Sequence, residues 1–226
     1  MARSGDPIDL KVFEADFFLD KMNTAGTDFL AVRFYFSAFV SASRSITFAL
    51  QAVLSEVDGF EEWYRAKQDY LRSIPIARFF VAIRNESQKI GHTPINAGTY
   101  GPAADPKAKY FFSGGFEGDP SLVPATDVVT ACSEYLTLLI GVIFDAYTTF
   151  DVLSPVSFFS VDSLRRHGMS IEEVEEALGL PRGWSKAEGY PDDARLDHLR
   201  ASVPDTAIDR IFLRYLKKAR PRGDAS

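Results

Sequence analysis

Apolar residues recur at helical spacing along most of the chain. Leu10, Phe13 and Phe17 lie three and four residues apart and predict a first helix over 6–22, whose opening Asp-Pro pair suits a cap and first turn. The same spacing predicts further long helices over 27–57, 58–90 and 125–151. A core of four helices follows from this pattern.

The third of these helices contains two local signals. Asp58 and Glu61 have the spacing of a capping box and predict its start. Pro75 removes a backbone hydrogen bond and clashes with the preceding turn, so we expect a kink or a restart between Ser73 and Pro75.

Residues 93–124 interrupt the helical pattern with repeated prolines and glycines. We interpret this stretch as a long loop, and loops of this length are commonly either functional or disordered. Its aromatic residues favour packing on the core, with Lys109–Phe112 as a short strand. The same rings could instead stack on unpaired bases.

Beyond Pro155 the pattern becomes shorter and more charged. Ser170 and Glu173 form a second capping-box pattern, and a final helix is predicted over 204–218. We therefore predict an all-α fold: a four-helix up-and-down bundle over residues 1–152, with a long Pro/Gly loop between its third and fourth helices, and a small helical extension over residues 153–226 that ends in a frayed basic tail.

Composition narrows the function classes. The 226-residue chain carries a net charge of −6, which argues against a dedicated non-specific DNA binder. Residues 170–184 superficially resemble half of a helix-turn-helix, but their four glutamates would repel phosphates, so we expect no DNA partner. Cys132 is the single cysteine, which excludes an intramolecular disulfide and fits a reducing cytosol.

The run from Phe34 to Leu54 is long enough for a membrane span, but Arg44 lies at its midpoint. A charge there costs about 2.5–3.5 kcal/mol, so we interpret this run and 128–150 as buried helices and expect no membrane partner. The N-terminus has no apolar stretch of secretory type, and we expect a cytoplasmic protein.

The common catalytic signatures are missing from the sequence. It has no glycine-rich phosphate loop, no nucleophile elbow and no closely spaced pair among His92, His167 and His198. We therefore expect neither a metal site nor a cofactor.

Arg84 and Asn85 are followed by His92 near the end of the third predicted helix. An arginine–asparagine pair with a histidine shortly after it, in a helical bundle, resembles the HEPN (higher eukaryotes and prokaryotes nucleotide-binding) family, many of whose members are metal-independent endoribonucleases. The resemblance implies that Arg84 stabilises charge on a scissile phosphate, that Asn85 orients the site and that His92 is the general base or acid. Seven residues separate Arg84 from His92, more than in active family members, so the chain must fold back after Gly91.

The same resemblance implies a protein that acts on RNA, an endoribonuclease of a toxin or phage-defence type, which works as a homodimer and has an antitoxin or other protein partner. Two alternatives stay open. One is a non-catalytic helical module that binds a protein or a ligand, with the proline-rich loop as its surface. The other is an enzyme of unrecognised mechanism that uses the region around Arg44.

Two pairs of charged residues have matching spacings. Arg33 and Arg44 are eleven residues apart on the second helix, and Glu134 and Asp145 are eleven apart on the fourth. Eleven residues is close to three turns, so each pair shares one face, and matched ion pairs between the helices are one interpretation. An anion or ligand pocket around Arg44 is the other.

The C-terminal segment is basic. Lys217, Lys218 and Arg220 could hold RNA beside the core, although cations also complement the end of a helix.

Overall fold

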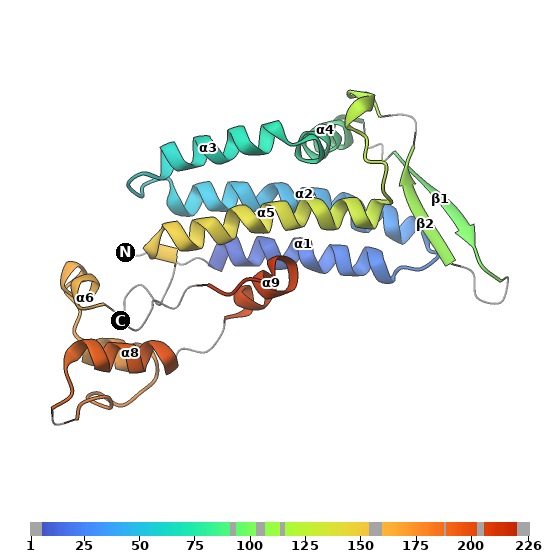
Figure 1. The fold of residues 1–226 in the computed structure, drawn as a ribbon. Coiled ribbons are helices and arrows are strands. Elements are labelled where there is room, and N and C mark those ends of the chain that lie inside the picture. The colour runs from blue at the N-terminus through green and yellow to red at the C-terminus, as the bar shows by residue number, and fades with distance from the viewer. Residues whose placement is uncertain are drawn as a thin grey trace. The chain divides into compact units, whose positions relative to one another are not determined.

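The computed structural model describes residues 6–90, 94–102, 107–113, 116–153, 160–187, 189–202 and 206–220. The chain is mostly helical and has one small two-stranded antiparallel sheet (Figure 1). It divides into two compact units, Asp6–Val142 and a second unit that begins at Ile143.

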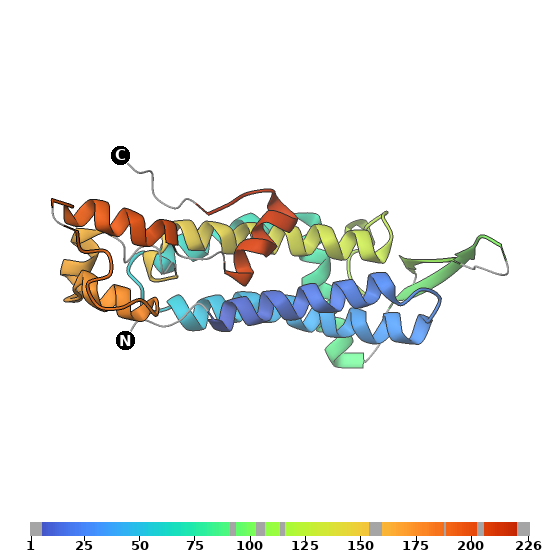
Figure 2. The same cartoon turned by 90° about the horizontal axis from the view of Figure 1, so that it is seen from below.

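The N-terminal unit is built on an antiparallel pair of helices, α1 (Asp6–Thr24) and α2 (Phe29–Leu54), which lie side by side in both views (Figures 1 and 2). The Asp28 carboxylate caps α2 by accepting a hydrogen bond from the Ala31 N–H at 3.0 Å. One stripe of α1 is buried at intervals of three and four residues: Ile8, Val12, Ala15, Leu19 and Met22. Helical periodicity therefore predicted both helices to within a few residues.

The predicted interruption at Pro75 is confirmed. Helix α3 (Phe60–Ser73) ends, and α4 (Pro75–Ile90) begins after a single extended residue, Ile74. Proline disfavours helical backbone in the residue before it, which accounts for the extended Ile74.

The predicted Asp58–Glu61 capping box is wrong. The residue that precedes α3 is Gly59, in a left-handed conformation with φ 78°, and no side chain caps the helix. Glu61 instead forms an exposed ion pair with Arg65 at 2.9 Å. A left-handed turn suits glycine, and it leaves Asp58 out of the capping position.

Helix α5 (Val128–Thr149) supplies apolar residues to the core, and its ends are narrower than the predicted 125–151. The Tyr135 ring stacks on Phe80 of α4 with centroids 4.4 Å apart. Among the described helices, α5 alone is long and apolar enough to cross a membrane by length and composition, and half of that window is buried inside the structure.

The predicted loop contains a β-hairpin, so the fold is not purely α. Strands β1 (Ile95–Tyr100) and β2 (Lys107–Phe112) pair antiparallel, with Ile95 opposite Phe112 and Tyr100 opposite Lys107. The strand expected at Lys109–Phe112 is confirmed and is longer than predicted. The hairpin projects beyond the ends of α1 and α2 in both views (Figures 1 and 2).

One face of the hairpin packs on the helices. The Phe112 ring lies 5.8 Å from Phe36 and 4.7 Å from Phe79. The Tyr110 hydroxyl donates a hydrogen bond to the Gly26 carbonyl at 2.7 Å. A short 3₁₀ turn, η1 (Pro120–Leu122), lies between the hairpin and α5 along the chain.

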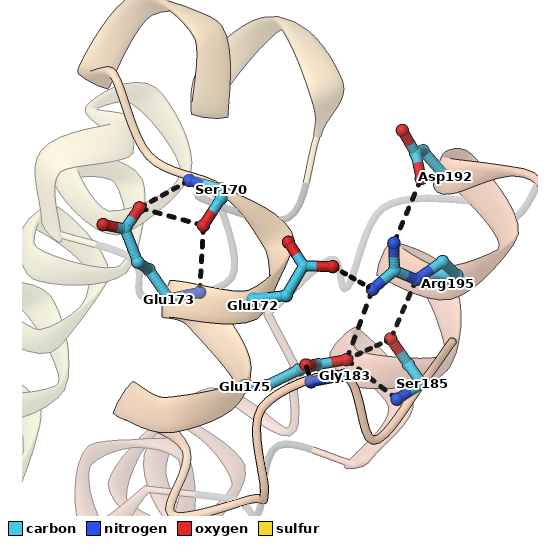
Figure 3. Close-up of polar contacts among 8 residues, drawn as sticks. All are labelled: Ser170, Glu172, Glu173, Glu175, Gly183, Ser185, Asp192 and Arg195. Atoms are coloured by element: carbon cyan, nitrogen blue, oxygen red, sulfur yellow. Dashed lines mark hydrogen bonds and ion pairs between the residues drawn. The ribbon is translucent and has the colours of Figure 1, made fainter.

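The described part of the second unit contains the end of α5, a 3₁₀ turn, η2 (Asp151–Leu153), and four short helices: α6 (Val161–His167), α7 (Ile171–Ala177), α8 (Asp192–Ser202) and α9 (Ala207–Leu216). A small core is shared by α6, α7 and α8, and consists of Leu164, Ile171, Val174, Leu196 and Leu199. The capping box predicted for Ser170 and Glu173 is confirmed (Figure 3).

A buried ion pair connects α7 to α8 (Figure 3). The Glu175 carboxylate is fully buried and accepts hydrogen bonds from the Ser185 N–H at 2.8 Å and from the Gly183 N–H. Arg195 approaches Glu175 at 3.5 Å and Glu172 at 2.8 Å. Burial alone would raise the pKa of Glu175, but hydrogen bonds from Ser185 and Gly183 and the charge of Arg195 hold that pKa below its ordinary value.

We expect Arg195→Leu to destabilise this unit by about 3–5 kcal/mol, because it leaves the Glu175 carboxylate buried without its cation. Hydrogen exchange of α7 and α8 amides measures the effect. Arg182→Leu is the matched control, since its ion pair with Glu176 is exposed and contributes little. Equal protection in both variants would contradict the structural role of Arg195.

Acid should weaken the same unit. The pKa of Glu175 is lower in the folded state than in the unfolded state, so its contribution is complete above about pH 4.3 and is lost as the pH falls through the folded value. Hydrogen exchange or circular dichroism, measured as the pH is lowered from 7 to 3, should show this loss of stability. Stability that rises over this interval would contradict the account.

Candidate functional site

A pocket of about 470 Å³ lies in the N-terminal unit among α2, α3, α4 and α5. Three arginines line it, namely Arg44, Arg72 and Arg78. Its other polar lining comes from Thr47, Gln68, Asn85, Tyr64 and Tyr135. The described lining contains no aspartate or glutamate, although Asp69, outside the lining, pairs with Arg72.

Arg44 lies in the middle of α2, in an apolar sequence, and is half-buried. One of its nitrogens, Nη1, donates a hydrogen bond to the Thr47 hydroxyl at 3.3 Å, and its guanidinium carbon lies 4.5 Å from the centre of the Phe48 ring. Both of these contacts are neutral. The charge of Arg44 is therefore available to an anion in the pocket.

Arg72 and Arg78 reach the pocket from opposite sides of the α3–α4 junction. Arg72 forms an exposed ion pair with Asp69 at 2.9 Å. Arg78 is exposed, and its charge acts on the nearby Asp119 carboxylate. The pKa of Asp119 is lowered mainly by hydrogen bonds from Ser121, and the charge of Arg78 lowers it further. Because the chain restarts at Pro75, two arginines six positions apart line one pocket from two helices.

Two tyrosines give the pocket flat walls. Tyr135 is 5% exposed, and its ring is parallel to Phe80. Burial raises the pKa of Tyr135 to about 12, although the charge of Arg44 acts in the opposite direction. Tyr64 is stacked on Phe60 at 5.2 Å. Both phenols are therefore held in place, and the Tyr135 hydroxyl stays protonated at neutral pH and can donate a hydrogen bond.

These groups are suited to binding. Guanidinium groups, phenols and amides donate hydrogen bonds to anionic oxygens. The described lining supplies no histidine, cysteine or carboxylate that could act as a base or a nucleophile. Among the described residues there is also no group of three or more histidine, cysteine, aspartate or glutamate side chains that could hold a metal ion.

The structure describes two of the three residues of the predicted catalytic motif. Arg84 is half-buried, and its Nη1 lies 3.5 Å from the Asn85 Oδ1. Asn85 lines the arginine pocket. His92 lies outside the described residues, so cleavage by Arg84 and His92 stays a prediction.

The matched pairs predicted between the second and fourth helices have different surroundings. Arg33 lies 5.9 Å from the Phe29 ring centre, and Glu134 is exposed. Asp145 belongs to the other compact unit, and its pairing stays a prediction. For Arg44 the described geometry favours the alternative reading, a ligand pocket, because its contacts are with a hydroxyl and a ring.

The three basic residues predicted to contact RNA are not equivalent. Arg220 is 10% exposed at its side chain and forms an ion pair with Asp209 at 2.5 Å, so its guanidinium stabilises the start of α9. Lys217 donates to the Arg214 carbonyl at 3.0 Å, and Lys218 lies 5.8 Å from the Phe144 ring centre. Both lysines are exposed, and RNA binding by this segment stays a prediction that rests on them.

Sequence reasoning missed most of the pocket. Arg72 and Arg78 look like ordinary surface cations in the sequence, and Tyr64 looks like a core residue of an amphipathic helix. The one signal that was available is Arg44, a charge inside an otherwise apolar helix.

Comparison with known proteins places a family match over this site. Residues 21–98 match the family model of the bacteriophage lambda protein ea47. The matched segment includes every lining residue of the pocket except Tyr135 and Leu139. No curated protein and no solved structure matches the chain.

The match to the ea47 family corrects the resemblance to HEPN proteins. The segment that holds Arg84 and His92 lies within the ea47 match, and no comparison links the chain to the HEPN family. An arginine, an asparagine and a histidine over nine positions form too short a motif to identify a family.

We expect Arg44→Met to change the free energy of unfolding by less than about 1 kcal/mol. The aliphatic stem is retained, and the main loss is a contact with the exposed Phe48 ring that is worth about 0.5–1 kcal/mol. Urea unfolding measures this. A loss above about 2 kcal/mol would instead identify Arg44 as half of a structural ion pair.

Proposed function

We propose that the protein binds a small phosphate-bearing organic anion in the pocket lined by Arg44, Arg72 and Arg78. The observation that carries the proposal is that three arginines line one cavity whose described lining holds no carboxylate. A cavity lined by arginines and without a carboxylate attracts anions.

The lining favours phosphate over other anions. Guanidinium groups are always charged and form paired hydrogen bonds that match the spacing of phosphate oxygens. Further hydrogen-bond donors in the lining are the Tyr135 hydroxyl and the side-chain amides of Gln68 and Asn85.

The volume limits the size of the ligand. A cavity of about 470 Å³ lies within the range of roughly 300–1,000 Å³ that is typical of small-molecule sites. The Tyr64 and Tyr135 rings provide apolar surface beside the arginines. A ligand with a planar ring and one or more phosphates, of mononucleotide size, fits these features.

The proposal concerns binding. Cleavage of RNA by Arg84 and His92 is a separate prediction that the pocket neither needs nor supports. We also propose that the pocket is held by an up-and-down arrangement of α1, α2, the α3–α4 pair and α5. Two observations support this arrangement: α1 and α2 are antiparallel, and Tyr135 of α5 stacks on Phe80 of α4.

Isothermal titration with inorganic pyrophosphate, AMP and ATP tests the proposal. We expect at least one probe to bind at a single site, and affinity to fall with added salt. Arg44→Met and Arg78→Met should each weaken binding by about 10–100-fold, the range expected for a hydrogen bond to a charged group.

Arg65→Met is the matched control. It removes one arginine from α3 that lies outside the pocket lining and forms an exposed ion pair with Glu61, so binding should not change. If none of the three probes binds, or if Arg65→Met weakens binding as much as Arg44→Met does, the proposal is wrong.

A further inference from the structure

The β1–β2 hairpin has two faces of different character. Directly paired residues of an antiparallel hairpin lie on the same face. One face has Ile95 and Tyr110 buried and Phe112 half-buried against the rest of the unit, whereas Ala97 and Thr99 on the same face are exposed. Tyr110 on this face has a pKa raised by burial and by the nearby Asp28 carboxylate.

The outward face is basic and aromatic. Its three pairs are Asn96 with Phe111, Gly98 with Lys109, and Tyr100 with Lys107. All six residues are exposed, and Tyr100 and Phe111 are 51% and 43% exposed. No acidic residue occurs among these six, although the chain as a whole carries a net charge of −6.

Gly98 lies at the centre of this face without a structural requirement for glycine. Several described glycines have a positive φ, but Gly98 does not. A Cβ added at Gly98 would meet nothing within 4 Å. Glycine weakens a strand interior and often marks a place where another molecule approaches the backbone closely. The gap that it leaves is flanked by the positions of Tyr100 and Asn96 on the same strand.

We propose that the outward face of the β1–β2 hairpin binds single-stranded nucleic acid. Lys107 and Lys109 contact the phosphates, the Tyr100 and Phe111 rings stack on unpaired bases, and the flat surface at Gly98 admits the chain between them. Sequence-tolerant binding of single strands elsewhere combines these same two components, cations along the backbone and exposed rings under the bases.

A duplex fits this face less well. Its bases are already stacked on one another, so exposed rings gain little, and two lysines alone provide a weak contact with its backbone. Lysines on an edge strand also prevent strands of different molecules from pairing. That explanation accounts for Lys107 and Lys109 but not for the rings or for Gly98.

Fluorescence anisotropy of the full chain with labelled 12-nucleotide oligo(U), oligo(dT) and a 12-base-pair duplex tests the proposal. We expect both single strands to bind more tightly than the duplex, and a tighter RNA or DNA arm identifies the natural class. Tyr100→Ala should weaken binding by about tenfold through lost stacking. Lys107→Gln with Lys109→Gln should reduce the salt slope by about 1.4.

Gly98→Val separates binding from folding. Valine favours a strand, so the hairpin should be no less stable, while its side chain fills the gap and should weaken binding several-fold. Circular dichroism and urea unfolding check that the fold is intact.

Two double variants complete the experiment. Lys11→Gln with Arg65→Gln removes two cations from exposed or half-buried ion pairs elsewhere and should leave affinity unchanged. Absence of single-strand binding, an equal loss in this control, or a loss confined to Lys217→Gln with Lys218→Gln would overturn the proposal.

Discussion

Two adjacent phenylalanines on α4 hold together the parts of the N-terminal unit on which both candidate sites depend. Phe80 stacks on Tyr135, which lines the arginine pocket. Phe39 of α2 packs edge-on against Phe80. Phe79 packs edge-on against Phe112, which anchors the hairpin. Aromatic pairs of this kind contribute about 0.5–1.5 kcal/mol each beyond their burial. The position of α4, fixed by the restart at Pro75, therefore sets the geometry of both sites.

A buried or half-buried arginine has different surroundings in the two units. In the C-terminal unit Arg195 is surrounded by acceptors, including the fully buried Glu175, so its charge is used within the fold. In the N-terminal unit the half-buried Arg44 has a hydroxyl and a ring as its described contacts, and it faces a cavity. A compensated arginine stabilises structure, whereas an arginine left facing a cavity is available for a ligand. This contrast separates a structural network from a candidate site.

Local patterns in the sequence predicted local structure. The helices over α1, α2 and α5, the break at Pro75 and the Ser170 capping box follow from spacing and from the chemistry of proline and serine. The start of α3 was misassigned because the left-handed Gly59 outweighs the Asp58 pattern, and β1 was missed because Asn-Ala-Gly-Thr carries no apolar alternation. The pocket could not be predicted, since Arg72, Arg78 and Tyr135 meet through tertiary packing alone. The family resemblance failed because three residues of common types carry little information.

The most direct measurement of the central claim is an NMR titration of the arginine side-chain Nε signals with pyrophosphate. If the pocket binds an anion, the signals of Arg44 and Arg78 shift and saturate together, and the signal of Arg195, which is held by Glu172 and Glu175, stays in place. Signals of Arg44 and Arg78 that do not move, or that move no more than those of exposed arginines such as Arg65, would contradict the account.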